Sequence, residues 1–458
     1  MPLSFYLSAA HKSSGKTVVS LGLCAAFKQQ SLNVQTFKKG PDYIDPIWLS
    51  KASGNPCYNL DFYNMTDHEI IQLYQNQILN SDINIIEGNK GLFDGMSVIG
   101  GDANADLAKL LMTPVILVID SRGITRGVAP LLSGYQLFDK EINIAGVILN
   151  KVASERHESK LIQAINYYTD ISVLGCIRRS KALIIDERHL GLMPANEISQ
   201  SQTFIKKVAK IITDQVDLNI LLDFNCIKSN KKIINTYTNI NTIKEKIIIA
   251  IAKDAVFNFY YQDDLDKFES LGVSIKYFDT LKDNNLPICD GLFIGGGFPE
   301  MKLEELNANQ SLLEDIKTKI EQNLPTYVEC GGLMYLTNSI THNKKTYSMM
   351  GVIDADTYMM SKPIGRGYVE LEPTDEHCWS GVSKHIYAHE FHYSKLKNIS
   401  SNTRYAFNVL RGVGVNNKFD GIMKYNLLAS YTHLHNVASN EWVIQFVNFV
   451  NKVKEQGL

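Results

Sequence analysis

The sequence predicts two α/β domains joined by a polar linker, and three observations support this fold class. The chain has 458 residues, more than a single hydrophobic core usually holds. Residues 3 to about 225 alternate short, β-branched apolar runs with amphipathic stretches, as βαβ units around a mainly parallel sheet do. Residues 226–246 are rich in Lys, Asn, Thr and Ile without a core pattern, and a second α/β pattern follows. We therefore expect domains at 1–225 and 247–458, with a linker at 226–246.

The composition excludes several classes of protein. The chain is 45% hydrophobic and 21% charged, with a formal net charge of −2, whereas nucleic-acid-binding proteins usually carry a strongly basic face. It has no run of about 18 apolar residues, so no membrane span is expected, and the N-terminal apolar run lacks the basic flank of a signal peptide. The seven cysteines form no C-x-x-C pair. A disulfide framework or zinc cage is therefore not expected, and a reducing cytoplasm fits.

The periodicity of apolar residues predicts the elements of each domain. In the first domain we expect strands at 4–9, 34–37, 83–87, 115–120 and 144–150, and a helix at 17–29. In the second domain we expect strands at 247–252, 291–294 and 326–329. The last of these strands ends directly before Cys330.

A phosphate-binding loop is predicted at residues 10–17, AHKSSGKT, which follow the first strand and open the first helix. In such a loop, backbone N–H groups around Ser13 and Gly15 and the helix N-terminus hold phosphate oxygens. Lys16 would contact the β- and γ-phosphates, and Thr17 would ligate Mg²⁺. Ala10 occupies a position where the usual pattern has Gly. The alternative interpretation is a Ser/Gly turn that caps a helix.

Carboxylates and lysines follow two further strands of this domain. Glu87 ends the strand at 83–87, where a carboxylate can hold Mg²⁺ directly or through water, and Asp94 lies seven residues on in a Gly-bounded loop. The segment FKKGPDYIDP offers Lys38 and Lys39 to neutralise phosphate charge, and Asp42 and Asp45 to take a metal. Taken alone, that segment is equally compatible with a charged turn.

Cys330 lies in PTYVECGGLM, which we interpret as a strand, a sharp turn and a helix. A helix N-terminus favours a thiolate, and backbone N–H groups of Gly331 and of Gly296 in GGGFPE can face a developing oxyanion. A cysteine nucleophile needs a histidine, and the candidates are His433 and His435 in ASYTHLH. A lone cysteine is more often a small buried hydrophobe, but the flanking glycines favour a nucleophile here.

Seven motifs occur in one order along the chain: KKGPDYIDP, EGNKGLFDG, ILNKVASERHE, ERHLGLMPANE, GGGFPE, ECGGLMYL and ASYTHLH. Together they resemble the cobyrinate a,c-diamide synthase family of the corrin pathway, over about residues 3–440. The resemblance implies a P-loop domain of the dethiobiotin synthetase type and a C-terminal domain of the class I glutamine amidotransferase type.

The resemblance also implies an activity and its residues. ATP would phosphorylate the a- and c-acetate carboxylates of cobyrinate, and ammonia from glutamine would attack each acyl phosphate, with Mg²⁺ required. Cys330 matches the nucleophile and His433 the residue that raises its nucleophilicity. Lys16 and Thr17 match the nucleotide loop, and Asp45, Glu87 and Asp94 fall in motifs associated with the metal and the activated carboxylate. The expected partners are small molecules, without nucleic acid or membrane, and a homodimer is compatible with the sequence.

One position departs from the wider amidotransferase pattern. Typical class I domains carry a Glu two residues after the catalytic His, and here that residue is His435. The resemblance therefore implies a Cys–His dyad in which another group or the backbone orients His433. For His435 we expect only a structural or pocket-lining place.

Several alternatives stay open at the level of sequence. The substrate could be Ni-sirohydrochlorin or hydrogenobyrinate, because no motif identifies the metal at the ring centre. A P-loop scaffold ATPase with an inactive amidotransferase-like domain is the non-enzymatic alternative, against which the intact Cys330 and His433 argue. Because the substrate is rich in carboxylates, basic residues should line its pocket. The candidates are Lys39, Arg122, Arg126, Arg156, Arg188 and His189.

Overall fold

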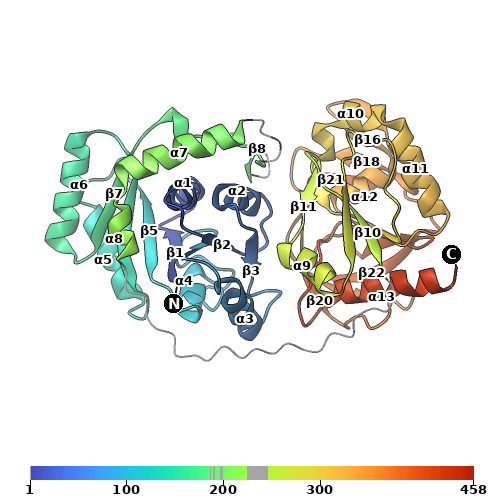
Figure 1. Ribbon diagram of the computed structural model, residues 1–458, viewed down its shortest axis with the longest axis horizontal. Coiled ribbons are helices and arrows are strands. Elements are labelled where there is room, and N and C mark those ends of the chain that lie inside the picture. The colour runs from blue at the N-terminus through green and yellow to red at the C-terminus, as the bar shows by residue number, and fades with distance from the viewer. Residues whose placement is uncertain are drawn as a thin grey trace. The chain divides into compact units, whose positions relative to one another are not determined.

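The computed structural model describes residues 2–185, 187, 188, 191–195, 197, 200–223 and 246–457, with backbone only at 187–188 and 191–192. The chain forms two compact units, Met1–Asn235 and Thr236–Leu458 (Figure 1). The division between them falls within the predicted linker at 226–246, of which only residue 246 is described. Arg188 and His189, two of the basic candidates for the substrate pocket, lie outside the described side chains.

The first unit is built on a parallel sheet of seven strands in the order β3-β2-β4-β1-β5-β6-β7. Its strands are β1 (Leu3–Ala9), β2 (Val34–Lys39), β3 (Cys57–Leu60), β4 (Ile83–Glu87), β5 (Val115–Asp120), β6 (Ile144–Val152) and β7 (Ser172–Arg178). The strands β2, β4 and β5 are buried almost throughout, because helices cover both faces of the sheet (Figure 1). A two-strand hairpin, β8 (Glu187–Arg188) and β9 (Gly191–Leu192), is separate from this sheet.

The helices of this unit share an apolar core with the strands. The helix α1 (Lys16–Gln29) packs with α2 (Ile44–Ser53) and α7 (Ser201–Gln215) over β1. The remaining helical segments are α3 (Asp67–Gln77), α4 (Asn104–Leu110), α5 (Val128–Phe138), α6 (Glu155–Tyr168), η1 (Lys181–Leu183) and α8 (Leu218–Leu222). Because β1 lies between β4 and β5, the loop that follows β1 comes out beside the carboxyl ends of both neighbours.

The second unit contains a nine-stranded sheet in the order β12-β10-β13-β15-β24-β23-β22-β19-β20. The first five strands in that order pair in parallel, and the others pair antiparallel. The strands are β10 (Ile248–Ala252), β12 (Ser274–Phe278), β13 (Gly291–Ile294), β15 (Thr326–Glu329), β19 (Gly365–Pro373), β20 (Ile386–His392), β22 (Arg404–Arg411), β23 (Phe419–Lys424) and β24 (Leu427–Ser430). The pairing of β15 with β24 places the residues that follow these two strands side by side.

Smaller elements complete the second unit. A four-stranded sheet contains β16 (Thr337–His342), β17 (Lys345–Ser348), β18 (Ile353–Met359) and β21 (Ser394–Lys397), and β11 (Phe257–Phe259) pairs with β14 (Gly296–Gly297). The helical segments are α9 (Gln262–Ser270), η2 (Pro299–Met301), α10 (Leu303–Ala308), α11 (Gln310–Glu321), α12 (Gly331–Leu336) and α13 (Trp442–Glu455). No helix in the described part of the chain is long and apolar enough to cross a bilayer.

The α/β fold class predicted from the sequence is confirmed for both units. The predicted strands at 83–87, 115–120, 291–294 and 326–329 agree with the structure to the residue. The sequence analysis missed the antiparallel half of the second sheet and the four-stranded sheet. Some of those strands, such as β18 and β21, alternate buried and exposed residues, so they lack the continuous apolar runs that reveal parallel strands.

Candidate active sites

The phosphate loop of the first unit lies between β1 and α1, and its backbone depends on Gly15. That residue has a φ of +91°, and a Cβ there would lie 2.2 Å from Asn150 Nδ2, so conformation and space both favour glycine. Asn150 Nδ2 donates to the Ser14 carbonyl at 2.8 Å, and Lys151 Nζ donates to the Ser13 carbonyl at 2.9 Å. The end of β6 therefore holds the loop in its curved conformation.

Lys16 is buried at the start of α1, and its Nζ donates to the Lys90 carbonyl at 2.8 Å. Burial, together with the charge of Lys38, lowers the pKa of Lys16 to about 8. Ala10 does not have a positive φ, so this first loop position does not need glycine. The loop thus provides a nearly buried ammonium group at a helix N-terminus, which is suited to phosphate.

Thr17, Asp45 and Glu87 come together beside the phosphate loop. Thr17 Oγ1 lies 2.9 Å from Glu87 Oε1 and 3.3 Å from Asp45 Oδ2. Hydroxyl and carboxylate oxygens are the ligands that Mg²⁺ prefers. This donor set fits the ion, and the binding of Mg²⁺ by these three residues stays a prediction.

Lys38, one of the two lysines predicted to neutralise phosphate charge, pairs in the structure with the carboxylates of Asp45 and Glu87. Its Nζ lies 2.9 Å from Glu87 Oε1 and also forms an ion pair with Asp45. Burial opposes the charged form, but the carboxylates of Asp45 and Glu87 outweigh it and raise the pKa of Lys38 well above its usual range. Lys38 therefore balances a buried negative charge next to the loop.

Lys39 and Asp94 occupy different surroundings. Lys39 is buried, with Nζ 5.9 Å from the centroid of the Phe62 ring, and it points away from Lys38 because side chains alternate along a strand. Asp94 is exposed, and its Oδ2 accepts from the Gly91 N–H at 3.0 Å. Asp94 therefore closes the loop whose Lys90 carbonyl contacts Lys16, whereas Lys39 is not part of that cluster.

A cavity of about 520 Å³ opens beside the phosphate loop. It has apolar walls and a basic rim, and it is lined in part by Gly15, Val19, Asn150, Arg179 and Ile184. Arg122, one of the basic candidates, lies at this cavity and pairs with Asp120 at 2.7 Å. Arg126 and Arg156 are exposed.

In the second unit, Cys330 lies at the sharp turn between β15 and α12, as the motif predicted. Its φ of 46° and ψ of −98° are rare for a residue with a side chain. The Cys330 N–H donates to the Ser430 carbonyl at 2.7 Å, and Sγ lies 3.8 Å from the Phe391 carbonyl. The turn thus fixes the thiol at the carboxyl end of the parallel strands.

Burial raises the pKa of the Cys330 thiol, and the charges of Glu300 and Glu329 raise it further. We expected the helix N-terminus to favour the thiolate, and the backbone N–H of Gly331 does lower the pKa, but burial outweighs it. Desolvation disfavours the charged form of a buried thiol, and it is the largest influence on the pKa of Cys330. The thiol is therefore protonated and needs a base to become a nucleophile.

His433 follows β24, and it contacts His389 through its backbone and ring and Glu329 through Nδ1. Its backbone bridges His389, with the His433 N–H donating to the His389 carbonyl at 2.8 Å, and the two rings stack with centroids 5.0 Å apart. His433 Nδ1 lies 3.2 Å from Glu329 Oε2, and both side chains are buried. Burial, and then the charge of His433, lowers the pKa of His389 well below its usual range. Neutral His389 therefore serves as a packing surface for His433.

The glycine turn around β14 connects the histidine to the cysteine turn. A Cβ on Gly296 would lie 2.4 Å from His433 Cε1, and a Cβ on Gly331 would lie 2.8 Å from the Gly297 carbonyl oxygen. The same turn is thus in contact with His433 and with the residue after Cys330. The oxyanion role of Gly296 and Gly331 stays a prediction, and their backbones border the site where it would act.

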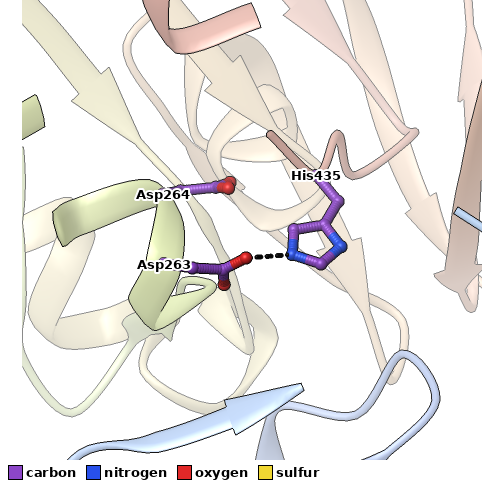
Figure 2. Close-up of side chains that lie close together, drawn as sticks. All are labelled: Asp263, Asp264 and His435. Atoms are coloured by element: carbon purple, nitrogen blue, oxygen red, sulfur yellow. Dashed lines mark hydrogen bonds and ion pairs between the residues drawn. The ribbon is translucent and has the colours of Figure 1, made fainter. Parts of the chain in front are cut away.

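His435 belongs to a separate buried cluster, shown in Figure 2 with Asp263 and Asp264 of α9. His435 Nε2 lies 2.6 Å from Asp263 Oδ2, and its ring stacks on Tyr261 at 4.0 Å. Asp264 accepts hydrogen bonds from the Asn436 N–H at 2.7 Å and from Trp442 Nε1 at 3.1 Å. These contacts join α9 to the segment after β24, and they give His435 a structural place.

Two contacts at these sites are not predicted from the sequence: the ion pairs of Lys38 with Asp45 and Glu87, and the contact of Glu329 with His433. Both involve a residue next to a predicted site residue in the chain: Lys38 precedes Lys39, and Glu329 precedes Cys330. A signal was available for Lys38, because alternation along β2 allows only one of two successive lysines to face the phosphate loop. For Glu329 no local signal existed, because its contact with His433 joins residues 104 positions apart.

A P-loop beside an oxygen-rich cluster of side chains in one unit, and a cysteine turn packed beside a histidine in the other, define a glutamine-dependent ligase. Family models agree with this class. Residues 9–192 match the CobQ/CobB/MinD/ParA nucleotide binding domain, and residues 248–441 match the CobB/CobQ-like glutamine amidotransferase domain.

Comparison with individual proteins identifies the family. The chain is 40% identical to the cobyrinate a,c-diamide synthase of Magnetococcus marinus over 445 residues, 95% of each chain. It is also 40% identical to that of Methanobrevibacter smithii, over 94% of this chain and 95% of the relative. The Listeria innocua enzyme is 38% identical over 94% of this chain and 95% of the relative. The chain therefore belongs to the cobyrinate a,c-diamide synthase family.

Proposed function

We propose that this protein amidates the a- and c-acetate carboxylates of cobyrinate, using ATP to activate each carboxylate and glutamine as the source of ammonia. The observation that carries the proposal is the presence of both reaction sites in one chain, each with its reactive residue held in place. The chain is 40% identical, over at least 94% of its length, to enzymes named for this reaction, and this similarity supports the choice of substrate.

In the first unit, the residues of the phosphate loop would bind ATP. Ser13 and Gly15 would contribute backbone N–H groups, and Lys16 would neutralise the phosphates as the γ-phosphoryl group moves to a carboxylate oxygen. ADP leaves, and the carboxylate becomes an acyl phosphate. The cavity beside Asn150 has the size and the apolar walls to receive the nucleoside.

Mg²⁺ would be held by Thr17, Asp45 and Glu87, and it would supply positive charge against the β- and γ-phosphates. Asp94, which closes the loop that contacts Lys16, would lie near the carboxylate that is activated. We propose that Lys39 binds other carboxylates of the substrate, because it is a lysine that does not pair with Asp45 or Glu87.

In the second unit, His433 would take the proton from Cys330 as sulfur attacks the glutamine amide carbon. The tetrahedral oxyanion would accept hydrogen bonds from the backbone N–H groups of Gly296 and Gly331. Collapse to the thioester releases ammonia, to which His433 returns the proton, and water then frees glutamate. Ammonia attacks the acyl phosphate and displaces phosphate, which gives the amide.

The experiment supplies the purified protein with cobyrinate, MgATP and either glutamine or ammonium chloride, and measures the diamide by mass spectrometry. Cys330→Ala should lower the glutamine-driven rate by more than about 100-fold. It should leave the ammonia-driven rate unchanged, because only the release of ammonia from glutamine requires the thiol. Lys16→Ala should lose both rates, because no acyl phosphate forms.

Turnover of Ni-sirohydrochlorin with none of cobyrinate would reject the proposed substrate and keep the chemistry. Retained ammonia-driven turnover in Lys16→Ala would reject the role of the phosphate loop. An unchanged glutamine-driven rate in Cys330→Ala would reject the nucleophile.

A further inference from the structure

Glu329 is a buried acid that reaches the candidate general base across 104 positions in the chain. Its Oε2 lies 3.2 Å from His433 Nδ1, with both side chains 2% exposed. It comes from the last residue of β15, directly before Cys330. One strand end therefore presents the nucleophile and, one residue earlier, an acid against the histidine.

The other oxygen of this carboxylate is already occupied. Glu329 Oε1 accepts from the Leu434 N–H at 2.9 Å and from the Tyr327 hydroxyl at 2.7 Å. Tyr327 is fully buried, and burial raises the pKa of its hydroxyl well above the usual range, so it stays a donor. These two donors fix the carboxylate so that Oε2 is directed at the imidazole.

This arrangement selects one tautomer of His433. A carboxylate oxygen accepts hydrogen bonds and donates none, so Nδ1 must carry the proton that faces Oε2. In the neutral ring, Nε2 is then left as the acceptor, which is the form that can take a proton from a thiol. The carboxylate also stabilises the imidazolium that forms once the proton has moved.

We propose that Glu329 is the positioning residue of the glutaminase site, and that it orients His433 in place of an acid two residues after the histidine. The inference rests on the proposed function, since it assigns Glu329 through the role of His433. His435 does not supply this group, because its ring is engaged with Asp263 and Tyr261.

Glu329→Gln is the sharpest test, because it changes one atom and inverts a hydrogen bond. The carboxamide oxygen should stay with Tyr327 and Leu434, which leaves the NH₂ group to face His433 Nδ1. That donor requires an unprotonated Nδ1 and moves the ring proton to Nε2. We expect kcat for glutamine hydrolysis to fall by about 100-fold, with KM for glutamine and the ammonia-driven rate within about twofold of wild type.

A double-mutant cycle separates positioning from a purely structural role. If Glu329 acts through His433, adding Glu329→Gln to His433→Asn should cause no further loss of kcat. Glu321→Gln, at an exposed position of α11, is the control and should match wild type. If Glu329→Gln does not fold, as judged by circular dichroism, Glu329→Asp keeps the buried charge but withdraws it from Nδ1, and the same loss of kcat is expected.

Three results would overturn this assignment: a kcat for E329Q within about threefold of wild type, a rise in KM that accounts for the loss, or losses that multiply in the double variant. A failure of the proposed function looks different. In that case the wild-type protein itself shows no glutaminase activity, or Cys330→Ala retains it.

Discussion

At the scale of single residues, burial disfavours the charged form of both reactive groups, the Cys330 thiolate and the Lys16 ammonium. Cys330 has a backbone conformation that costs about 1–3 kcal/mol for a residue with a side chain. Its thiol is kept neutral by burial and by neighbouring carboxylates. Lys16 is a buried ammonium next to Lys38. Each charged form therefore needs a partner in the reaction: a base that takes the proton of the thiol, and phosphates that pair with the ammonium group.

The lowered pKa of Lys16, about 8, predicts a pH dependence of nucleotide binding. The amine is charged below this pKa and neutral above it, and phosphates favour the charged form. At constant Mg²⁺, the Kd for ADP should therefore rise by about tenfold between pH 7 and pH 9, as measured by titration calorimetry. Lys16→Met should bind weakly at both pH values with a ratio near one. An unchanged Kd in the wild-type protein would contradict a Lys16 that titrates in this range.

At the scale of elements, the glycine turn at β14 shapes the second site, because each of its two residues leaves space that a larger side chain would fill. A Cβ on Gly297 would lie 1.8 Å from the Val256 carbonyl oxygen, so the pairing of β14 with β11 requires glycine. Gly296 in turn leaves the space that the His433 ring occupies. The short strand thus sets how closely the histidine approaches the cysteine turn.

Gly296→Ala should therefore displace the His433 ring, because the added methyl would lie 2.4 Å from Cε1. A misplacement of about 1 Å at a reacting group costs on the order of 100-fold in rate. We expect a loss of about 10- to 100-fold in the glutamine-driven rate and an unchanged ammonia-driven rate. Gly134→Ala in α5 adds a methyl where no atom lies within 4 Å, and this control should match wild type. Equal rates for both variants would show that the turn relaxes without moving the histidine.

At the scale of the whole molecule, each unit has a buried apolar core of its own. The buried apolar cluster of the first unit runs from Phe5 to Leu221, and those of the second lie between Ile247 and Val450. Among the described residues, each of these clusters stays within one unit. A ligand that binds one unit is therefore expected to stabilise that unit alone.

Differential scanning calorimetry with MgADP tests this independence. At a free concentration of 100 times Kd, ADP should add about 2.7 kcal/mol to the free energy of unfolding of the first unit. One of two transitions should shift upward, and the other should stay in place. Lys16→Ala should remove the shift without moving the second transition. A single transition that moves as a whole would contradict two independently unfolding units.

The sequence by itself determined the fold class, the core strands of the parallel regions, the phosphate loop and the cysteine turn. These features are local: a buried parallel strand is a continuous apolar run, and a P-loop or a strand–turn–helix motif is contiguous in the chain. Only the tertiary structure decided the partners across the sheets. Lys38 meets Glu87 because β2 lies beside β4, and Glu329 meets His433 because β15 pairs with β24. Strand order and register bring such residues together, and neither is encoded within the segments themselves.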